Sequence, residues 1–203
     1  MPAKVSAKRP PSGAAVFQPH VTDAITAAVV DEMADKGYSG MSMDSVARRA
    51  GVGKSAIYRR WSSKEEMTVD VISQLIVFDE VNIDTGTLRG DLRQALAEMH
   101  EWLSDDRIRR IYVDLLAHGM RNTALADALT THIGLPRRAR GMKILERAIA
   151  RGEMHATIDR EMVLDMVGAP VFWRLVARRE EMTPTSLDQL ADALARGIGA
   201  DSR

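Results

Sequence analysis

Six basic side chains and no acidic one lie between residues 45 and 64, in a chain of 203 residues whose 28 Lys+Arg and 28 Asp+Glu give zero net charge. Residues 1–62 carry nine cations against five acids, a net charge of +4, so the remainder carries −4. An island of one sign is the electrostatic footprint of a polyanion-binding surface, whereas an ordinary solvated helix face mixes both signs. The basic island therefore predicts a contact with nucleic acid.

Residues 43–61 have the pattern of two short helices joined by a tight turn at Gly51. Val52 and Ile57 face the core that the helices share, and Gly51 supplies the left-handed turn. The second helix is left with an outward face of Lys54, Ser55, Arg59 and Arg60. Short polar groups and cations are what a helix needs to read the major groove of DNA, and Lys54 and Arg60 are the best candidates for contacts with guanine O6 and N7.

The run from Gly40 to Met67 resembles the DNA-binding domain of TetR-type (tetracycline-repressor-like) transcriptional regulators. The Ala-Gly-Val turn at 50–52, Tyr58, the aromatic residue three positions later and the Ser-Lys-Glu at 63–65 match in order. The resemblance implies that Tyr58 and Lys64 bind phosphates and that Ser42 contributes at the start of the preceding helix. The predicted DNA-binding residues are Ser42, Lys54, Ser55, Tyr58, Arg59, Arg60 and Lys64.

The fold class is predicted to be all-α, with about nine helices, because apolar residues recur three or four positions apart and no alternating strand is evident. We expect a disordered basic arm over 1–19, a three-helix helix-turn-helix DNA-binding domain over 20–66 and a helical regulatory domain for ligand binding and dimerisation over 67–203. Ser63 to Glu66 form a capping-box pattern at a helix start. Gly134-Leu135-Pro136 is expected to interrupt a helix.

The last two helices carry apolar stripes with small residues, a pattern that favours pairing across a two-fold axis. TetR-type proteins dimerise in this way, so the resemblance implies a homodimer through these helices. Two recognition helices would then lie one DNA turn apart, roughly 34–36 Å, on a palindromic double-stranded operator.

A small-molecule pocket, if present, is expected among the helices of the regulatory half. Met is abundant at twelve residues, and its flexible side chain suits an adaptable site for an apolar effector. Each candidate is also an ordinary core residue by pattern alone. The candidate pocket residues are Met99, Trp102, Leu103, Tyr112, Leu116, Met120, Met142, Met166, Phe172 and Trp173.

The sequence contains no complete catalytic motif, so an enzyme is not expected, and neither is a cofactor or a metal. Gly51-Val52-Gly53-Lys54-Ser55 mimics the end of a phosphate-binding loop, but Arg48 stands where the first glycine is required. The absence of Cys removes thiolate catalysis and Cys-based zinc sites. No apolar run approaches the ~18–20 residues of a membrane span, so a cytoplasmic protein is expected.

The sequence thus predicts a one-component transcriptional regulator, a repressor that a small molecule releases from DNA. Two alternatives stay open. The first is a helical dimerisation or adaptor protein without sequence-specific DNA binding. The second is a transcriptional activator that uses the same domain.

Overall fold

The computed structural model describes residues 19–76 and 83–199, and within these ranges it contains helices and no strand. The predicted basic arm therefore lies outside the described residues, except for its last residue, which begins the first helix. In chain order the elements are α1 (Pro19–Gly40), α2 (Met43–Arg49), α3 (Lys54–Tyr58), α4 (Lys64–Ile76), α5 (Leu88–Ser104), α6 (Asp106–Gly119), α7 (Thr123–Leu129), the π-helical turn η1 (Thr130–Gly134), α8 (Leu135–Ala150), α9 (Arg160–Phe172), the π-helical turn η2 (Trp173–Arg178) and α10 (Pro184–Ile198). The all-α prediction is confirmed.

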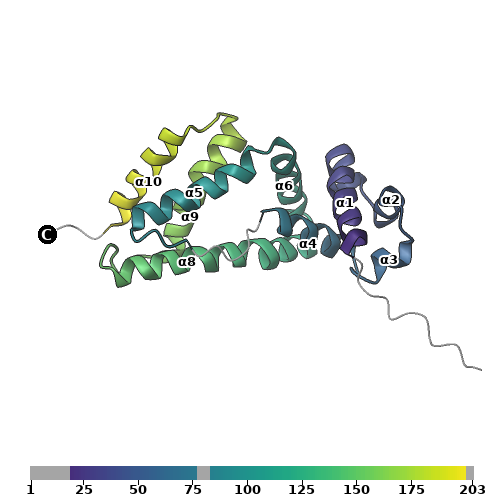
Figure 1. Cartoon of the computed structure of the whole chain (residues 1–203), viewed down its shortest axis with the longest axis horizontal. Coiled ribbons are helices and arrows are strands. Elements are labelled where there is room, and N and C mark those ends of the chain that lie inside the picture. Colours follow the sequence, from purple (N-terminus) through teal and green to yellow (C-terminus); the bar gives the residue numbers. More distant parts are fainter. Residues whose placement is uncertain (1–18, 77–82, 200–203) are drawn as a thin grey trace, which may run out of the picture.

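Helices α1 to α3 form the helix-turn-helix at one end of an elongated molecule (Figure 1). The Ser42 hydroxyl accepts a hydrogen bond from Ser45 N–H, and the Ser45 hydroxyl accepts one from Ser42 N–H, so the two residues cap α2 reciprocally. Gly51 has φ 67°, the left-handed conformation that the tight turn between α2 and α3 requires. The predicted two-helix unit is therefore present with its predicted turn residue.

Helix α4 begins close to the predicted capping pattern, with one difference. The Ser63 hydroxyl accepts from Glu66 N–H at 3.1 Å, as expected, but the Glu66 carboxylate accepts from Ser62 N–H at 2.8 Å, one residue before the expected donor. The helix continues without interruption to Ile76, with Met67 and Val71 fully buried. Helix α4 therefore extends across the expected domain boundary at residue 66 and connects the two halves of the chain.

The expected interruption at Gly134-Leu135-Pro136 is wrong. Leu135 keeps helical angles (φ −62°, ψ −44°), and α7, η1 and α8 form one helical run. A π-turn inserts one extra residue, and it lies directly before Pro136, whose ring and missing N–H do not fit a regular helix interior. In the next run the order is reversed, since the π-helical turn η2 begins three residues after Pro170.

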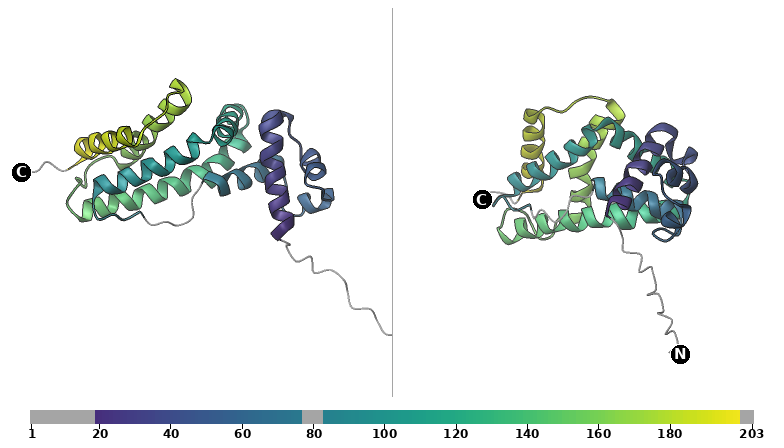
Figure 2. Two further views of the ribbon diagram at one scale, coloured as in Figure 1. Left: turned by 45° about the horizontal axis from the view of Figure 1, so that its top comes forward. Right: turned by 45° about the vertical axis from the view of Figure 1, so that its right-hand side comes forward.

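Helix α10 lies along α5 in the regulatory half, as the views in Figure 2 show. Its apolar stripe is buried there, and it consists of Leu187, Ala191, Leu194 and Ile198. Arg93 Nε and Asp188 Oδ1, 2.7 Å apart, hold one edge of this contact. The inner face of α10 is thus used within the chain, and only its outer face is left for a partner.

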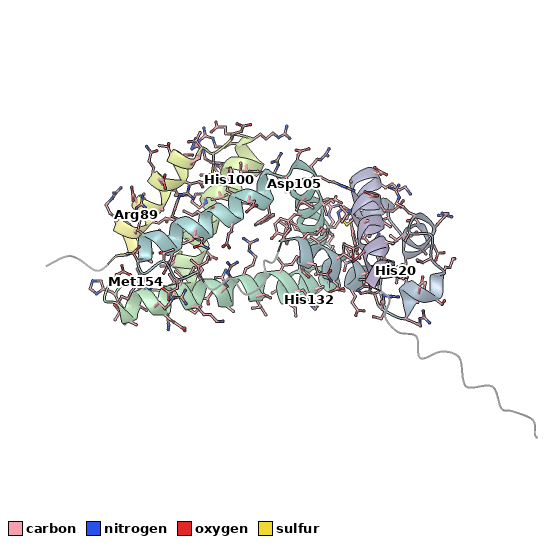
Figure 3. The ribbon with its side chains drawn as sticks, viewed as in Figure 1. His20, Arg89, His100, Asp105, His132 and Met154 are labelled. Atoms are coloured by element: carbon pink, nitrogen blue, oxygen red, sulfur yellow. The ribbon has the colours of Figure 1, made fainter. Side chains whose placement is uncertain are left out.

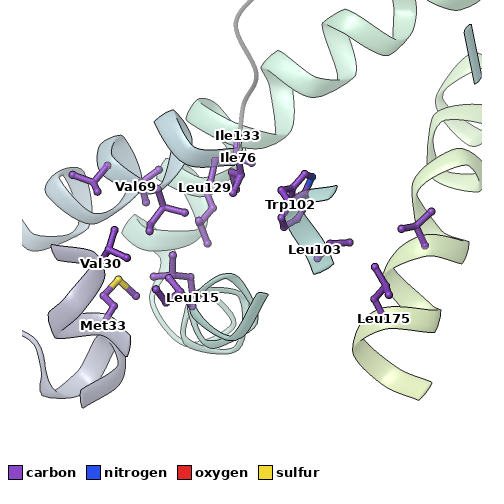
Figure 4. Packing of buried hydrophobic residues seen from close by; sticks show 14 of the residues in the cluster. Val30, Met33, Val69, Ile76, Trp102, Leu103, Leu115, Leu129, Ile133 and Leu175 are labelled. Atoms are coloured by element: carbon purple, nitrogen blue, oxygen red, sulfur yellow. The ribbon is translucent and has the colours of Figure 1, made fainter. Parts of the chain in front are cut away.

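Two neighbouring residues of α5 point in different directions within the core (Figure 4). Leu103 lies toward Leu175 of η2, whereas Trp102 lies on the side of Ile76 and Ile133, which come from α4 and η1. Helix α5 therefore packs on α9 and η2 with one side and faces the α4–α8 side with the other.

Candidate DNA-binding interface and effector cavity

The outward face of α3 is formed by Lys54, Ser55, Tyr58 and Arg59, all exposed. Their spacing of one and four positions puts these four side chains on one side of a helix. The opposite side holds Ile57, which is fully buried. We call Ser42, Lys54, Ser55, Tyr58 and Arg59 the recognition surface, because Ser42 is exposed at the adjoining start of α2.

Trp61 fixes the orientation of this face. Its ring is buried, and its indole N–H donates to Asp70 Oδ2 of α4 at 2.8 Å. Tyr58, three residues earlier, keeps 54% of its surface exposed. The aromatic pair therefore divides between the two roles, with Trp61 in the core and Tyr58 available for contact.

Two of the predicted DNA-binding residues lie away from the recognition surface. An N–H of the Arg60 guanidinium donates to the carbonyl of Ala56 at 2.8 Å, so this side chain folds back along α3. The ammonium of Lys64 lies 4.1 Å from the centroid of the Tyr38 ring, in a cation–π contact. Burial lowers the pKa of Lys64. Arg60 and Lys64 thus already have partners within the chain, and their contacts with DNA stay predictions.

The basic island also has acidic partners that its sequence window does not contain. Arg49 pairs with Glu32 (Nε–Oε1, 2.8 Å) and Asp35 (Nη2–Oδ2, 2.7 Å) of α1, and Lys54 pairs with Asp44 of α2. These pairs reduce the positive charge of the surface below what residues 45–64 alone indicate. Arg49 consequently holds α2 against α1.

A cluster of polar contacts joins the helix-turn-helix to α6. Tyr38 N–H donates to Asp114 Oδ2 at 2.7 Å, and the Ser39 hydroxyl lies 2.7 Å from His118 Nε2. The Tyr38 hydroxyl donates to Glu65 Oε1, at the start of α4, at 2.9 Å. We call Tyr38, Ser39, Glu65, Asp114 and His118 the junction. It ties the end of α1 and the start of α4 to one side of α6.

The chemistry of the junction is that of a neutral phenol bonded to a carboxylate. Burial, and then the hydrogen bond to Glu65, raise the pKa of Tyr38 far above its ordinary value. Burial alone would raise the pKa of Glu65, but hydrogen bonds from its own N–H and from Tyr38 outweigh burial and lower it. Both groups therefore hold fixed protonation states near neutral pH.

A cavity of about 1080 Å³ lies between α5, α6, α8 and α9. None of the residues that line it belongs to α1, α2 or α3. The helix-turn-helix, with His20 at the start of α1, lies at the opposite end of the molecule from Arg89 and Met154 of the regulatory half (Figure 3). Several predicted pocket residues line it, namely Met99, Trp102, Tyr112, Leu116 and Phe172. The sequence analysis missed the basic residues of α8 that share the same wall, since no motif marks them.

The other candidate pocket residues are not among those that line this cavity, so their part in an effector site stays a prediction. Leu103 is fully buried in the core, and Met142 of α8 is not part of the cavity wall. Met120 is 87% exposed just after α6. Met166 and Trp173 are 44% and 62% exposed on the outside of α9 and η2. A helical stripe of large apolar residues does not by itself distinguish a cavity wall from an outer face.

The comparisons with known proteins define the class. Residues 25–71 match the family described as bacterial regulatory proteins, tetR family, and residues 82–194 match the tetracyclin repressor-like C-terminal domain. The DNA-binding transcriptional repressor TetR of Mycobacteroides abscessus is 31% identical over 153 residues, covering 75% of this chain and 80% of that protein. The chain belongs to the TetR family of transcriptional regulators.

Solved structures agree in fold. The TetR family transcription regulator SCO0332 superposes with a TM-score of 0.69 at 24% identity, over 88% of this chain and 98% of that one. FadR from Bacillus subtilis, solved in complex with stearoyl-CoA, gives a TM-score of 0.67 at 18% identity, over 87% and 99% of the two chains. The protein is thus a transcriptional regulator with an N-terminal helix-turn-helix DNA-binding domain. None of the described helices is long and apolar enough to cross a membrane.

Proposed function

We propose that this regulator is a repressor that acts in the cytoplasm by binding and not by catalysis. A homodimer occupies a palindromic operator through its two recognition surfaces, and a small molecule in the cavity releases it. The observation that carries the proposal is the position of α6. Tyr112 and Leu116 of α6 line the cavity, while Asp114 and His118 of the same helix form the junction with α1.

Helix α6 gives ligand binding a direct mechanical route to DNA binding. A ligand that moves Tyr112 or Leu116 displaces the helix that carries Asp114 and His118, and the end of α1, which leads into α2 and α3, must follow or lose its hydrogen bonds. A coupling free energy of about 1–3 kcal/mol between the two sites is typical of allosteric proteins. Release follows if the ligand binds better to the arrangement in which the two recognition surfaces no longer match the operator.

The outer side of α9 and η2 supports dimerisation. Met162, Met166 and Trp173 expose 57%, 44% and 62% of their surfaces at spacings of four and seven residues, which puts them on one side of the helix. Large apolar residues gathered on one exposed face mark an interaction site. Paired with the outer face of α10, this stripe is where we place the two-fold axis.

Selection of bound sequences from a random duplex library, at about 150 mM salt, tests the proposal. We expect a palindrome whose half-sites lie about one helical turn apart. Binding without any enriched motif, lost as salt rises, would contradict sequence-specific recognition and favour the adaptor reading. Transcription from a reporter that carries the selected site then separates a repressor from an activator.

A further inference from the structure

Arg137, in the first turn of α8, differs from the cations beside it in the cavity wall. Arg138 pairs with Asp165 at 2.8 Å (Nη1–Oδ1), and Arg140 pairs with Glu98 at 2.6 Å (Nη2–Oε2). Within residues 19–76 and 83–199, no ion pair joins Arg137 to a carboxylate. Its guanidinium instead lies over the ring of Trp102, with Cζ 4.9 Å from the centroid. Among the described residues, Arg137 is thus a cation in the cavity wall without a direct ion pair, and the Glu98 carboxylate acts on it only from beyond ion-pair distance.

The environment of Arg137 is costly for a charge. The side chain is half-buried, and burial lowers its pKa, but a guanidinium remains charged at neutral pH. The face of the Trp102 ring carries partial negative charge and attracts the guanidinium, but the ring has no net charge to neutralise it. A partly desolvated cation gains most from an anion that fits its planar set of donors, and carboxylates do so with two parallel hydrogen bonds.

Trp102 supplies a second observation at the same place. The residue is 5% exposed, and its indole N–H has no acceptor in the part of the chain that the structure describes. Tyr112 meets the Trp102 ring edge-on, with centroids 5.1 Å apart and an angle of 88° between planes. Burial raises the pKa of the Tyr112 hydroxyl, which therefore stays protonated and able to donate. Trp102, whose indole N–H lacks an acceptor among the described residues, thus lies directly beside Arg137, with Tyr112 packed against its ring.

The remainder of the wall is largely apolar. It includes Ile76, Met99, Leu116, Ile144, Leu164 and Phe172. The volume of about 1080 Å³ slightly exceeds the usual range for small-molecule sites, roughly 300–1000 Å³. An apolar body of considerable length therefore fits beside the donors.

We propose that the cavity binds an amphipathic carboxylate, whose carboxylate pairs with the Arg137 guanidinium and whose apolar body lies between α5, α8 and α9. A single negative charge suffices to pair with Arg137, because Arg138 and Arg140 in the same wall are already paired with Asp165 and Glu98. This inference rests on the proposed role of the cavity as the effector site, and it adds the chemical class of the effector.

The test compares straight-chain carboxylates with alcohols of the same length by calorimetry on the whole protein without DNA. The probes are octanoate, dodecanoate and hexadecanoate and the matching primary alcohols, below their micelle concentrations. We expect the best carboxylate to bind about tenfold or more tightly than its alcohol. Equal affinity of each acid and its alcohol, or no binding of any of them, would overturn the proposal.

Two variants locate the charge. Arg137→Gln should remove the preference for the carboxylate, about tenfold or more, and leave alcohol binding unchanged. Lys143→Gln is the matched control, because Lys143 is an exposed cation on the same helix and the same wall. Equal losses in both variants, or none in Arg137→Gln, would refute a specific pair with Arg137. If the Arg137→Gln protein fails to fold, Arg137→Lys replaces it in the test. This variant keeps the positive charge but loses the bidentate hydrogen bond to the carboxylate, so it should weaken the binding of carboxylates and not of alcohols.

Operator occupancy measured with and without dodecanoate separates this inference from the proposed function. Binding that depends on Arg137 but leaves occupancy unchanged supports the carboxylate site and contradicts the proposed release. Release by an uncharged ligand, with no carboxylate preference, supports the proposed function and refutes the carboxylate.

Discussion

Replacing Asp44 by Asn should strengthen DNA binding without a comparable change in stability. Asp44 and Lys54 form an ion pair in which the two side chains are 44% and 66% exposed. Water screens such a pair, so its loss should change the free energy of unfolding by less than about 1 kcal/mol. The substitution also frees Lys54 on the recognition surface and removes an acid that would repel phosphates.

The gain on DNA can be estimated. Two unit charges 4 Å apart in water interact by about 1 kcal/mol. Removing the repulsion between the Asp44 carboxylate and a DNA phosphate should therefore raise the affinity for DNA roughly fivefold. If the released Lys54 neutralises one further phosphate, the slope of log K against log salt steepens by about 0.9. Fluorescence anisotropy of a labelled duplex over a salt series measures both quantities, and urea unfolding measures stability.

Asp192→Asn is the matched control, because the Asp192–Arg89 pair is similarly exposed but lies between α10 and α5. It should change neither affinity nor slope. If Asp44→Asn weakens binding, or changes preference at one base pair without steepening the slope, then Asp44 itself accepts a hydrogen bond from a base and the argument from charge is wrong.

Three further variants test other parts of the structure. Arg60→Ala should cost about 1 kcal/mol of stability by urea unfolding, since Arg60 hydrogen-bonds the Ala56 carbonyl; altered preference at one base pair with unchanged stability would instead make it a base contact. Asp91→Asn should cost about 3 kcal/mol at pH 7, because its buried carboxylate pairs with Arg151 at 3.0 Å. Burial alone would raise the pKa of Asp91, but hydrogen bonds and Arg151 lower it. Its contribution is therefore complete above the ordinary carboxyl pKa of about 4 and lost as pH falls below that, so wild-type and variant stabilities should converge in acid, and parallel curves would refute the pairing. Trp173→Glu should shift sedimentation from dimer to monomer while circular dichroism stays helical, and an unchanged dimer would exclude this face.

Local signals predicted the local structure well. Gly51 takes the predicted left-handed turn, and Ser63 caps the start of α4 by accepting from Glu66 N–H, as their residue types indicate. In each case the physical cause lies within four residues in sequence. The prediction of a helix break at Pro136 was wrong because a π-helical turn accommodates the proline. No residue pattern predicts such a turn.

Contacts between distant segments were beyond such signals. The charge of Arg49 and Lys54 was read from a window that excluded Asp35 and Asp44, so the pairing was missed. Met166 was assigned to the pocket because apolar periodicity gives a stripe but not the neighbour that covers it. The sequence does not distinguish Arg137 from other helical arginines, because its contact with the Trp102 ring is visible only in the structure.

The most direct test of the account is the stoichiometry and spacing dependence of binding to the selected operator. We expect two chains per duplex. Inserting about five base pairs between the half-sites turns them to opposite sides of the DNA, and affinity should fall to the non-specific level. One chain per duplex, with affinity unaffected by the insertion, would contradict a homodimer that holds two recognition surfaces one helical turn apart.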